Sequence, residues 1–108
     1  MSEEQSEIDV YESRRFEKAL AKLSQSQLMV VEDEIEKVIA NPELGELKKG
    51  DLSHLRVHKF SMDNQQVLLG YSWIEDKLEL YLLSIGHHEN FYTKMKESRK
   101  GDLKLVKS

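Results

Sequence analysis

The chain has 108 residues, 39% of them hydrophobic and 33% charged, and a formal net charge of −4 at pH 7. This length fits a single domain, and the composition is well short of that of a disordered protein. Because the chain has no cysteine, disulfide scaffolds, thiolate zinc sites and cysteine nucleophiles are excluded. No apolar run approaches the roughly 20 residues that span a bilayer, and the acidic start does not resemble a secretory signal. We therefore expect a cytoplasmic protein that has no membrane partner.

Charge is distributed unevenly along the chain. Residues 1–12 hold five acidic side chains and no basic one, whereas the segment 48–60 is mostly basic. Its basic side chains are Lys48, Lys49, His54, Arg56, His58 and Lys59. The net acidity disfavours nucleic acid binding, but this segment is compatible with a local basic surface. Charge alone favours the simpler alternative, a solvated face.

The chain begins with a polar segment and a short strand. Residues 1–7 are acidic and polar, and we expect them to be disordered. The apolar residues Ile8, Val10 and Tyr11 then fit a first, short strand.

Two apolar stripes with helical spacing follow the first strand. The first stripe consists of Phe16, Leu20 and Leu23. The second consists of Leu28, Val31, Ile35, Val38 and Ile39. Ser24 or Ser26 can cap the second helix, and Asn41-Pro42 ends it, because the residue before a proline avoids the helical region. The very short connection predicts an antiparallel helical hairpin.

After Gly45 the apolar period changes from that of a helix to that of a strand. Leu55 and Val57 alternate with polar residues and indicate a half-buried strand. Residues 66–74 and 78–85 are apolar on both faces, which is typical of central strands. Turn chemistry at Asp63-Asn64 and at residues 75–77 joins the three strands into an antiparallel meander.

The C-terminal segment predicts one more helix. Asn90 can cap it and Gly101 ends it, so residues 101–108 form a tail that is either an edge strand or disordered. The order is therefore β-α-α-β-β-β-α. We expect an α+β fold, a single domain over residues 8–100, in which the helical hairpin packs on a small twisted antiparallel sheet.

The segment from Gly86 to Tyr92 carries the candidate chemistry, because it lies where a central strand ends and a helix begins. A histidine there can transfer a proton near neutral pH, and a tyrosine can carry a proton or stack on a base. For any single residue, a structural role is the simpler interpretation: Asn90 as a cap, Phe91 as a core anchor, and one histidine on the surface.

The four histidines do not predict a metal site. His54 and His58 would lie on the order of 13 Å apart on a strand, and the adjacent His87 and His88 would point apart. Neither spacing lets ligands converge on one ion. We expect neither a metal nor another cofactor.

The element order and four local motifs resemble the RelE/ParE superfamily of bacterial toxins. The motifs are NPELG at 41–45, GDL at 50–52 with Leu55-Arg56, the apolar hairpin VLLGYSW to LELYLLSI, and GHHE at 86–89 with Tyr92. They cover roughly residues 8–98. The resemblance implies the toxin of a type II toxin-antitoxin system, which arrests growth and is neutralised by an antitoxin protein.

In the RelE-like branch the resemblance implies an endoribonuclease that cuts mRNA on the ribosome and so inhibits translation. Carried over to this chain, His88 would be the general acid, with Tyr92 or His58 assisting as base. Residues that would hold the substrate are Arg56, Lys59, His87 and Gln66. The ribose 2′-hydroxyl attacks the neighbouring phosphate, and the reaction needs a base, an acid and a cation.

The chain departs from the family on its middle strand, where Gln65-Gln66 replaces a pattern that contains an arginine. An amide binds a phosphate but does not neutralise it. Two other functions therefore stay open: a ParE-like toxin that inhibits DNA gyrase without catalysis, and an inactive toxin fold that only binds. A small interaction domain with no toxin role is a further alternative. An enzyme needs His88, Tyr92 and at least one of Arg56, His58 and Lys59 in one cleft.

Overall fold

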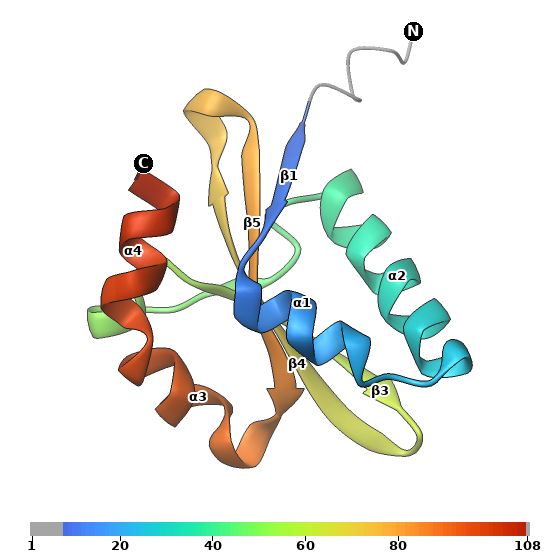
Figure 1. Ribbon diagram of the computed structural model, residues 1–108. Coiled ribbons are helices and arrows are strands. Elements are labelled where there is room, and N and C mark those ends of the chain that lie inside the picture. The colour runs from blue at the N-terminus through green and yellow to red at the C-terminus, as the bar shows by residue number, and fades with distance from the viewer. Residues whose placement is uncertain (1–7, 108) are drawn as a thin grey trace, which may run out of the picture.

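The computed structural model describes residues 8–107, so the expectation for residues 1–7 lies outside the described residues. Within them, five strands form one mixed sheet with the order β1-β5-β4-β3-β2 (Figure 1). The strands are β1 (Asp9–Glu12), β2 (Glu46–Leu47), β3 (Arg56–Met62), β4 (Gln65–Ile74) and β5 (Glu79–His87). The helices are α1 (Arg14–Ala21), α2 (Gln25–Ala40), α3 (His88–Glu97) and α4 (Arg99–Lys107), with short 3-10 turns at Gly50–Leu52 and Glu75–Lys77. The α+β class is confirmed.

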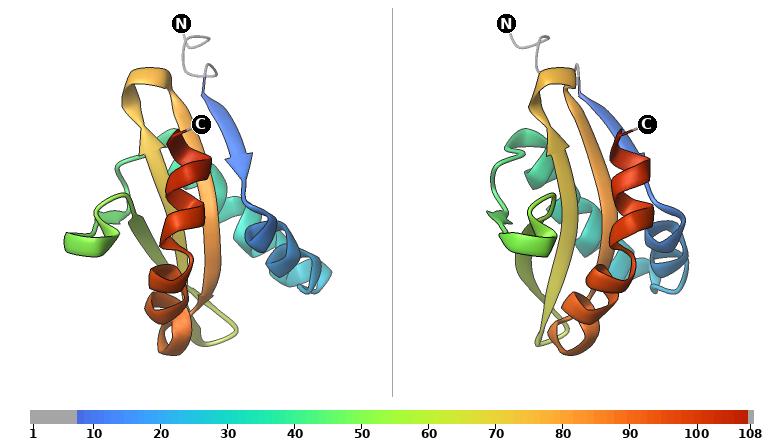
Figure 2. Two further views of the ribbon diagram at one scale, coloured as in Figure 1. Left: turned by 60° about the vertical axis from the view of Figure 1, so that its left-hand side comes forward. Right: turned by 90° about the vertical axis from the view of Figure 1, so that its left-hand side faces the viewer.

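Helices cover both faces of the sheet, α1 and α2 on one and α3 and α4 on the other (Figures 1 and 2). The first core joins Phe16, Val31 and Val38 of the helical hairpin to Phe60, Val67, Leu69, Tyr71, Leu80 and Leu82 of the sheet. The second core consists of Leu52, Leu55, Val57, Leu68, Tyr81, Leu83, Phe91, Met95 and Val106. No described helix is long and apolar enough to cross a membrane.

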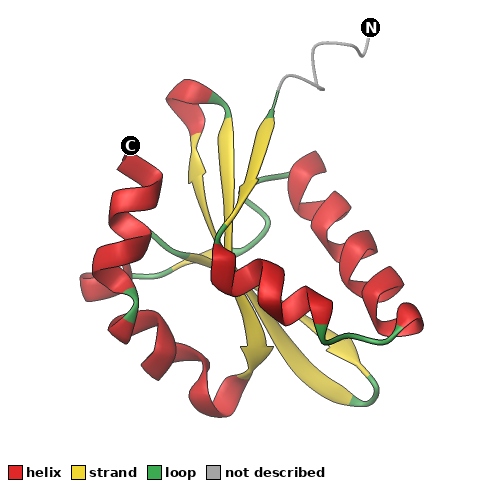
Figure 3. Cartoon of the chain, viewed as in Figure 1, coloured by secondary structure: helices red, strands yellow, loops and turns green. Residues whose placement is uncertain are grey.

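The predicted meander of β3, β4 and β5 is confirmed (Figure 3). Asp63 and Asn64 join β3 to β4 with φ angles of 55° and 62°. Two consecutive residues in the left-handed region form the turn whose twist suits a two-residue hairpin, and asparagine and aspartate tolerate it well. Ser24 caps α2 and accepts a hydrogen bond from the backbone of Gln27, which settles the choice between the two serines.

The sheet is mixed, whereas the sequence predicted an antiparallel one. β1 pairs in parallel with β5, with Asp9 opposite Glu79 and Glu12 opposite Leu82. β1 pairs with the edge of β5 that β4 leaves open, because β4 pairs with the other edge of β5. The sequence also missed β2, since a strand of two residues has no readable period.

The C-terminal end differs most from the prediction. His87, not Asn90, is the N-cap of α3, and the helix ends at Glu97 rather than at Gly101. The predicted tail forms α4, in which Asp102 and Val106 are buried. A short helix is marginal alone and needs tertiary packing, and no local pattern reports that packing.

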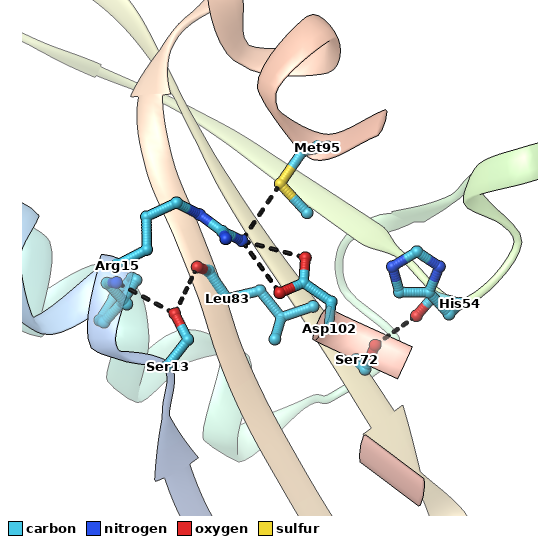
Figure 4. A network of polar contacts seen from close by, with 8 residues as sticks. Ser13, Arg15, His54, Ser72, Leu83, Met95 and Asp102 are labelled. Atoms are coloured by element: carbon cyan, nitrogen blue, oxygen red, sulfur yellow. Dashed lines mark hydrogen bonds and ion pairs between the residues drawn. The ribbon is translucent and has the colours of Figure 1, made fainter. Parts of the chain in front are cut away.

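A buried ion pair joins the two ends of the fold. The Arg15 guanidinium on α1 donates two hydrogen bonds to the Asp102 carboxylate on α4, at 3.2 and 3.0 Å (Figure 4). The same nitrogen lies 3.8 Å from the sulfur of Met95. The Asp102 residue is 4% exposed, so its charge needs this partner. The pair links residues 87 positions apart and holds α4 against α1.

Gly70 allows α3 to pack closely on the sheet. A Cβ added at Gly70 would lie 2.7 Å from the ζ-carbon of Phe91 and 3.1 Å from a methyl group of Leu55. We predict that Gly70→Ala lowers the free energy of unfolding by about 1–3 kcal/mol, because a buried ring must move. Urea unfolding measures this change. Gly101→Ala is the control, because a Cβ there meets no atom within 4 Å; equal stability of both variants would contradict the prediction.

Candidate functional site

The start of α3 places His88 and Tyr92 next to each other. They lie one helical turn apart, and their rings meet edge to face with centroids 5.7 Å apart. His88 is exposed and Tyr92 is half-buried. Phe91 is buried in the second core and touches the Tyr92 ring at 5.2 Å between centroids. The helix is thus anchored by Phe91, while His88 stays accessible beside a fixed tyrosine.

Lys48 completes this group from the other side. Its ammonium lies 5.3 Å from the centroid of the Tyr92 ring, within the range of a cation–π contact. It also forms an ion pair with Glu46 at 3.0 Å. The hydrogen bond to Glu46 raises the pKa of Lys48 more than burial lowers it, so Lys48 is cationic at neutral pH.

The buried Tyr71 on β4 holds the loop that leads to Lys48. Its hydroxyl donates to the carbonyl of Pro42 at 2.7 Å and accepts from the backbone N–H of Gly45 at 2.8 Å. Burial raises the pKa of Tyr71, so its hydroxyl keeps the proton that it donates. A Cβ at Gly45 would lie 2.8 Å from the Tyr71 oxygen. The NPELG motif is therefore a structural clamp that positions β2 and the lysine after it.

Side chains of β3 alternate between the two faces of the sheet. Val57 belongs to the second core, so Lys59 shares the face of α3. The hydrogen bond from Lys48, and to a smaller extent the charge of Lys59, lower the pKa of Glu46. Lys59 thus belongs to the same surface as Lys48, and we call Lys48, Lys59, His88 and Tyr92 the α3-side cluster.

Arg56 and His58 lie on the opposite face. Arg56 donates hydrogen bonds to the carbonyls of Gly45 at 2.8 Å and Glu43 at 3.3 Å. His58 contacts Glu34 of α2 at 2.7 Å and stacks on Phe60. The sheet backbone lies between these two side chains and the α3 side. Both have partners within this chain, and the expected roles of His58 as base and Arg56 as phosphate ligand stay predictions.

His87 and Gln66 are exposed beside the cluster. His87 Nδ1 lies 3.4 Å from the Gln66 carbonyl oxygen, and both residues line a cavity of about 760 Å³ together with His88. The cavity thus brings together three of the seven residues predicted from the sequence, namely Gln66, His87 and His88, and Tyr92 contacts His88. Lys59 lies on the same face of the sheet. Sequence reasoning assigned no site role to Lys48, although it stood in the basic segment that was noted.

Exposed acidic and basic side chains occur on both helical layers, and the layer of α1 and α2 includes the basic residues Arg14, Lys18, Lys22 and Lys37. Basic residues predominate on the α3 side. The outer side of α2 carries Glu32, Asp33 and Glu36, all exposed. On the α3 side the exposed basic residues are Lys49, Lys59, Lys94, Lys96, Arg99, Lys100 and Lys104. A chain with a net negative charge can therefore present a basic surface to an anionic partner on the α3 side.

Comparisons with known proteins identify the family and the fold of this chain. A family model described as the ParE-like toxin of type II bacterial toxin-antitoxin systems matches residues 10–96. The chain belongs to this family. The predicted RelE/ParE resemblance is therefore confirmed, and the protein is a type II toxin of the RelE/ParE kind.

Solved structures show the same fold for this ParE-like toxin. It is similar to a free arginine-to-alanine double mutant of Escherichia coli RelE, with a TM-score of 0.67, 16% identity, and coverage of 86% of this chain and 96% of the other. It is also similar to RelE in the intact E. coli RelBE toxin-antitoxin complex, with a TM-score of 0.61, 18% identity, and coverage of 76% and 98%. No curated protein sequence matches the chain closely.

The Glu34 contact of His58 makes a pH-dependent contribution to stability. Burial alone would raise the pKa of Glu34, but hydrogen bonds from His58 and Lys37 outweigh it and lower this pKa below its ordinary value of 4.5. A carboxyl group whose pKa is lower in the folded state than in the unfolded state stabilises the fold at any pH above its unfolded-state pKa. This stabilisation is lost as the pH falls through the folded-state pKa. Between about pH 5 and pH 3 the parent should lose more stability than Glu34→Gln.

Urea unfolding midpoints across this pH range measure the difference. Glu32→Gln, on the exposed side of the same helix, is the matched control and should follow the parent. Parallel pH profiles of the parent and Glu34→Gln would contradict the prediction.

Proposed function

We propose that this toxin is an endoribonuclease that cleaves mRNA on the ribosome. The observation that carries the proposal is the convergence of an accessible histidine, a tyrosine and a lysine at the start of α3. Lys59 lies on the same face of the sheet, which supports the expectation from the sequence that an enzyme holds His88 and Tyr92 in one cleft with one of Arg56, His58 and Lys59.

The chemistry follows from these four residues. The 2′-oxygen of one ribose attacks the adjacent phosphate and loses its proton to a base, while the 5′-oxygen leaves and takes a proton from an acid. His88 is the general acid, because it is exposed and histidine is the residue type that most often transfers protons in catalysis. Tyr92 receives the proton of the 2′-hydroxyl or stacks on a base. Lys48 and Lys59 supply positive charge to the phosphorane.

Lys59 of the neighbouring strand β3, and Lys48 directly after β2, take the part of the missing middle-strand arginine. Gln66 stands opposite Ser61, and Lys59 stands opposite Leu68, the next β4 residue that points to the same face. Lys59 and Lys48 thus deliver cations beside a strand that has none. A lysine acts on a phosphate as a point charge rather than as a bidentate fork, so we expect a slower enzyme than one with the arginine.

The partner of this toxin is an antitoxin, because type II systems pair the two proteins. Among the similar structures, E. coli RelE is bound to RelB in one and to a RelB peptide in another, the latter with a TM-score of 0.61 and 18% identity. We infer that a neighbouring gene encodes an antitoxin that binds this chain and relieves growth arrest on co-expression.

The mechanism predicts that His88→Ala and Tyr92→Phe lose activity but keep the fold. Loss of one general acid typically lowers the rate by about 10²–10⁴, whereas loss of a surface side chain changes stability by about 0.5 kcal/mol or less. Cleavage of mRNA on translating ribosomes, mapped by primer extension, and thermal unfolding measure the two effects. Lys77→Ala, in the exposed turn between β4 and β5, is the control and should cleave like the parent.

The same assay separates the competing functions. If both variants arrest growth as strongly as the parent, catalysis is not the cause and the gyrase-inhibiting interpretation becomes the better one. DNA supercoiling by purified gyrase then provides the direct measurement. A parent that neither cleaves RNA nor inhibits gyrase would identify an inactive toxin fold.

Lys48 and Lys49 form a matched pair for testing the electrostatic contribution. They are neighbours in sequence, but only Lys48 lies over the Tyr92 ring. We predict that Lys48→Gln reduces cleavage by roughly tenfold or more, since a cation near the phosphorane stabilises its added charge, whereas Lys49→Gln has little effect. Equal losses would indicate a diffuse charge effect instead of a specific site.

A further inference from the structure

The two edges of the sheet differ in how they oppose pairing with a second copy of the chain. β1 forms one edge and β2 the other. In the antiparallel register that uses all four residues of β1, Asp9 of one copy would lie opposite Glu12 of the other. Like charges directly opposite each other destabilise a pair of strands. The β1 edge therefore disfavours self-pairing, although the apolar residues Val10 and Tyr11 are exposed on it.

The β2 edge presents free backbone groups at Leu47. The Lys48 N–H donates to the Leu55 carbonyl at 2.9 Å, and Leu47 stands opposite Arg56 of β3. In an antiparallel pair, residues whose N–H and C=O point to the partner strand alternate with residues whose groups point away from it. The N–H and C=O of Leu47 therefore point away from β3, toward the open edge of the sheet.

The side chains around Leu47 are complementary to those of a second copy. The Gly45 carbonyl already accepts a hydrogen bond from Arg56, so the free part of the edge is centred on Leu47. When Leu47 of two copies pair about a two-fold axis, Glu46 of each copy lies directly opposite Lys48 of the other. Opposite charges in this position stabilise a pair of strands. The Leu47 side chain, 51% exposed in the single chain, meets its own equivalent and loses contact with water.

We propose that two copies of this chain form a dimer in which their β2 edges pair antiparallel about Leu47. Each Leu47 N–H donates to the Leu47 carbonyl of the other copy, and two Glu46–Lys48 ion pairs flank these hydrogen bonds. Because directly opposite residues share a face, the α3 sides of both five-stranded sheets lie on the same side. Interfaces of small area are weak, so the dimer forms reversibly. The proposal does not depend on the ribonuclease function.

A disulfide tests the register directly, because the chain has no cysteine of its own. In a hydrogen-bonded antiparallel pair the two opposite Cα atoms lie about 5.5 Å apart, a distance that suits a disulfide. Leu47→Cys should therefore be cross-linked as a dimer under mild oxidation, measured on a non-reducing gel. Val10→Cys, at an exposed position on the β1 edge, is the matched control and should stay monomeric on the gel.

Charge reversal tests the two ion pairs. Sedimentation of the parent over roughly 10 μM to 1 mM, where weak complexes dissociate, should show a reversible dimer. Glu46→Lys and Lys48→Glu should each be monomeric, because each places like charges opposite each other. An equimolar mixture of these two variants should dimerise, since each supplies the charge that the other lacks.

A control variant separates the position of a charge from its amount. Glu32→Lys changes the net charge as much as Glu46→Lys does, but it lies on the exposed side of α2. It should dimerise like the parent. Thermal unfolding of each variant verifies that it is folded.

Several results would overturn the dimer. They are a parent that stays monomeric over the whole range, equal cross-linking of Val10→Cys and Leu47→Cys, and a mixture of the two charge variants that stays monomeric. Binding of a different protein at β2 by a chain that is monomeric alone would assign this edge to another partner instead of a second copy. None of these results would overturn the ribonuclease, which the cleavage assay tests separately.

Discussion

The burial of β4 on both faces is the constraint on which the rest of the structure depends. From Val67 to Ser72 every residue of this strand is buried, so each face of the sheet must carry a helical layer. Leu69 and Tyr71 contact the layer of α1 and α2, and Leu68 contacts that of α3 and α4. The side chains of each neighbouring strand therefore alternate between two faces of the sheet. One face packs under α1 and α2, and the other faces the α3 side.

The face on which each polar side chain of β3 lies determines which residues it contacts. His58 and Lys59 are adjacent in sequence, but His58 is held by Glu34 under α2, whereas Lys59 faces the side of α3. Arg56, a residue that suits phosphate binding by type, instead binds backbone carbonyls near the Tyr71 clamp. Residue chemistry alone therefore does not assign function; the face of the sheet does.

Two kinds of charge interaction serve different purposes in this small fold. The Arg15–Asp102 pair is largely shielded from water on the aspartate side and fixes the C-terminal helix to the N-terminal one. The Glu46–Lys48 pair leaves Glu46 68% exposed in its side chain, and such pairs contribute little to stability. Lys48 can therefore leave Glu46 at small cost, as its proposed contact with a phosphate requires.

The sequence by itself determined the helical hairpin, the meander, the Asp63-Asn64 turn and the family, because these depend on periods and motifs that lie close along the chain. It also indicated His88 and Tyr92, since they follow the end of a central strand and match a motif of the family. Tertiary structure alone decided the parallel pairing of β1 and the helical state of residues 99–107. It also decided which partners Arg56 and His58 contact, and it placed Lys48 over the Tyr92 ring. These features depend on contacts between residues far apart in the chain, such as Arg15 with Asp102, and no local pattern encodes which partner a distant residue will meet.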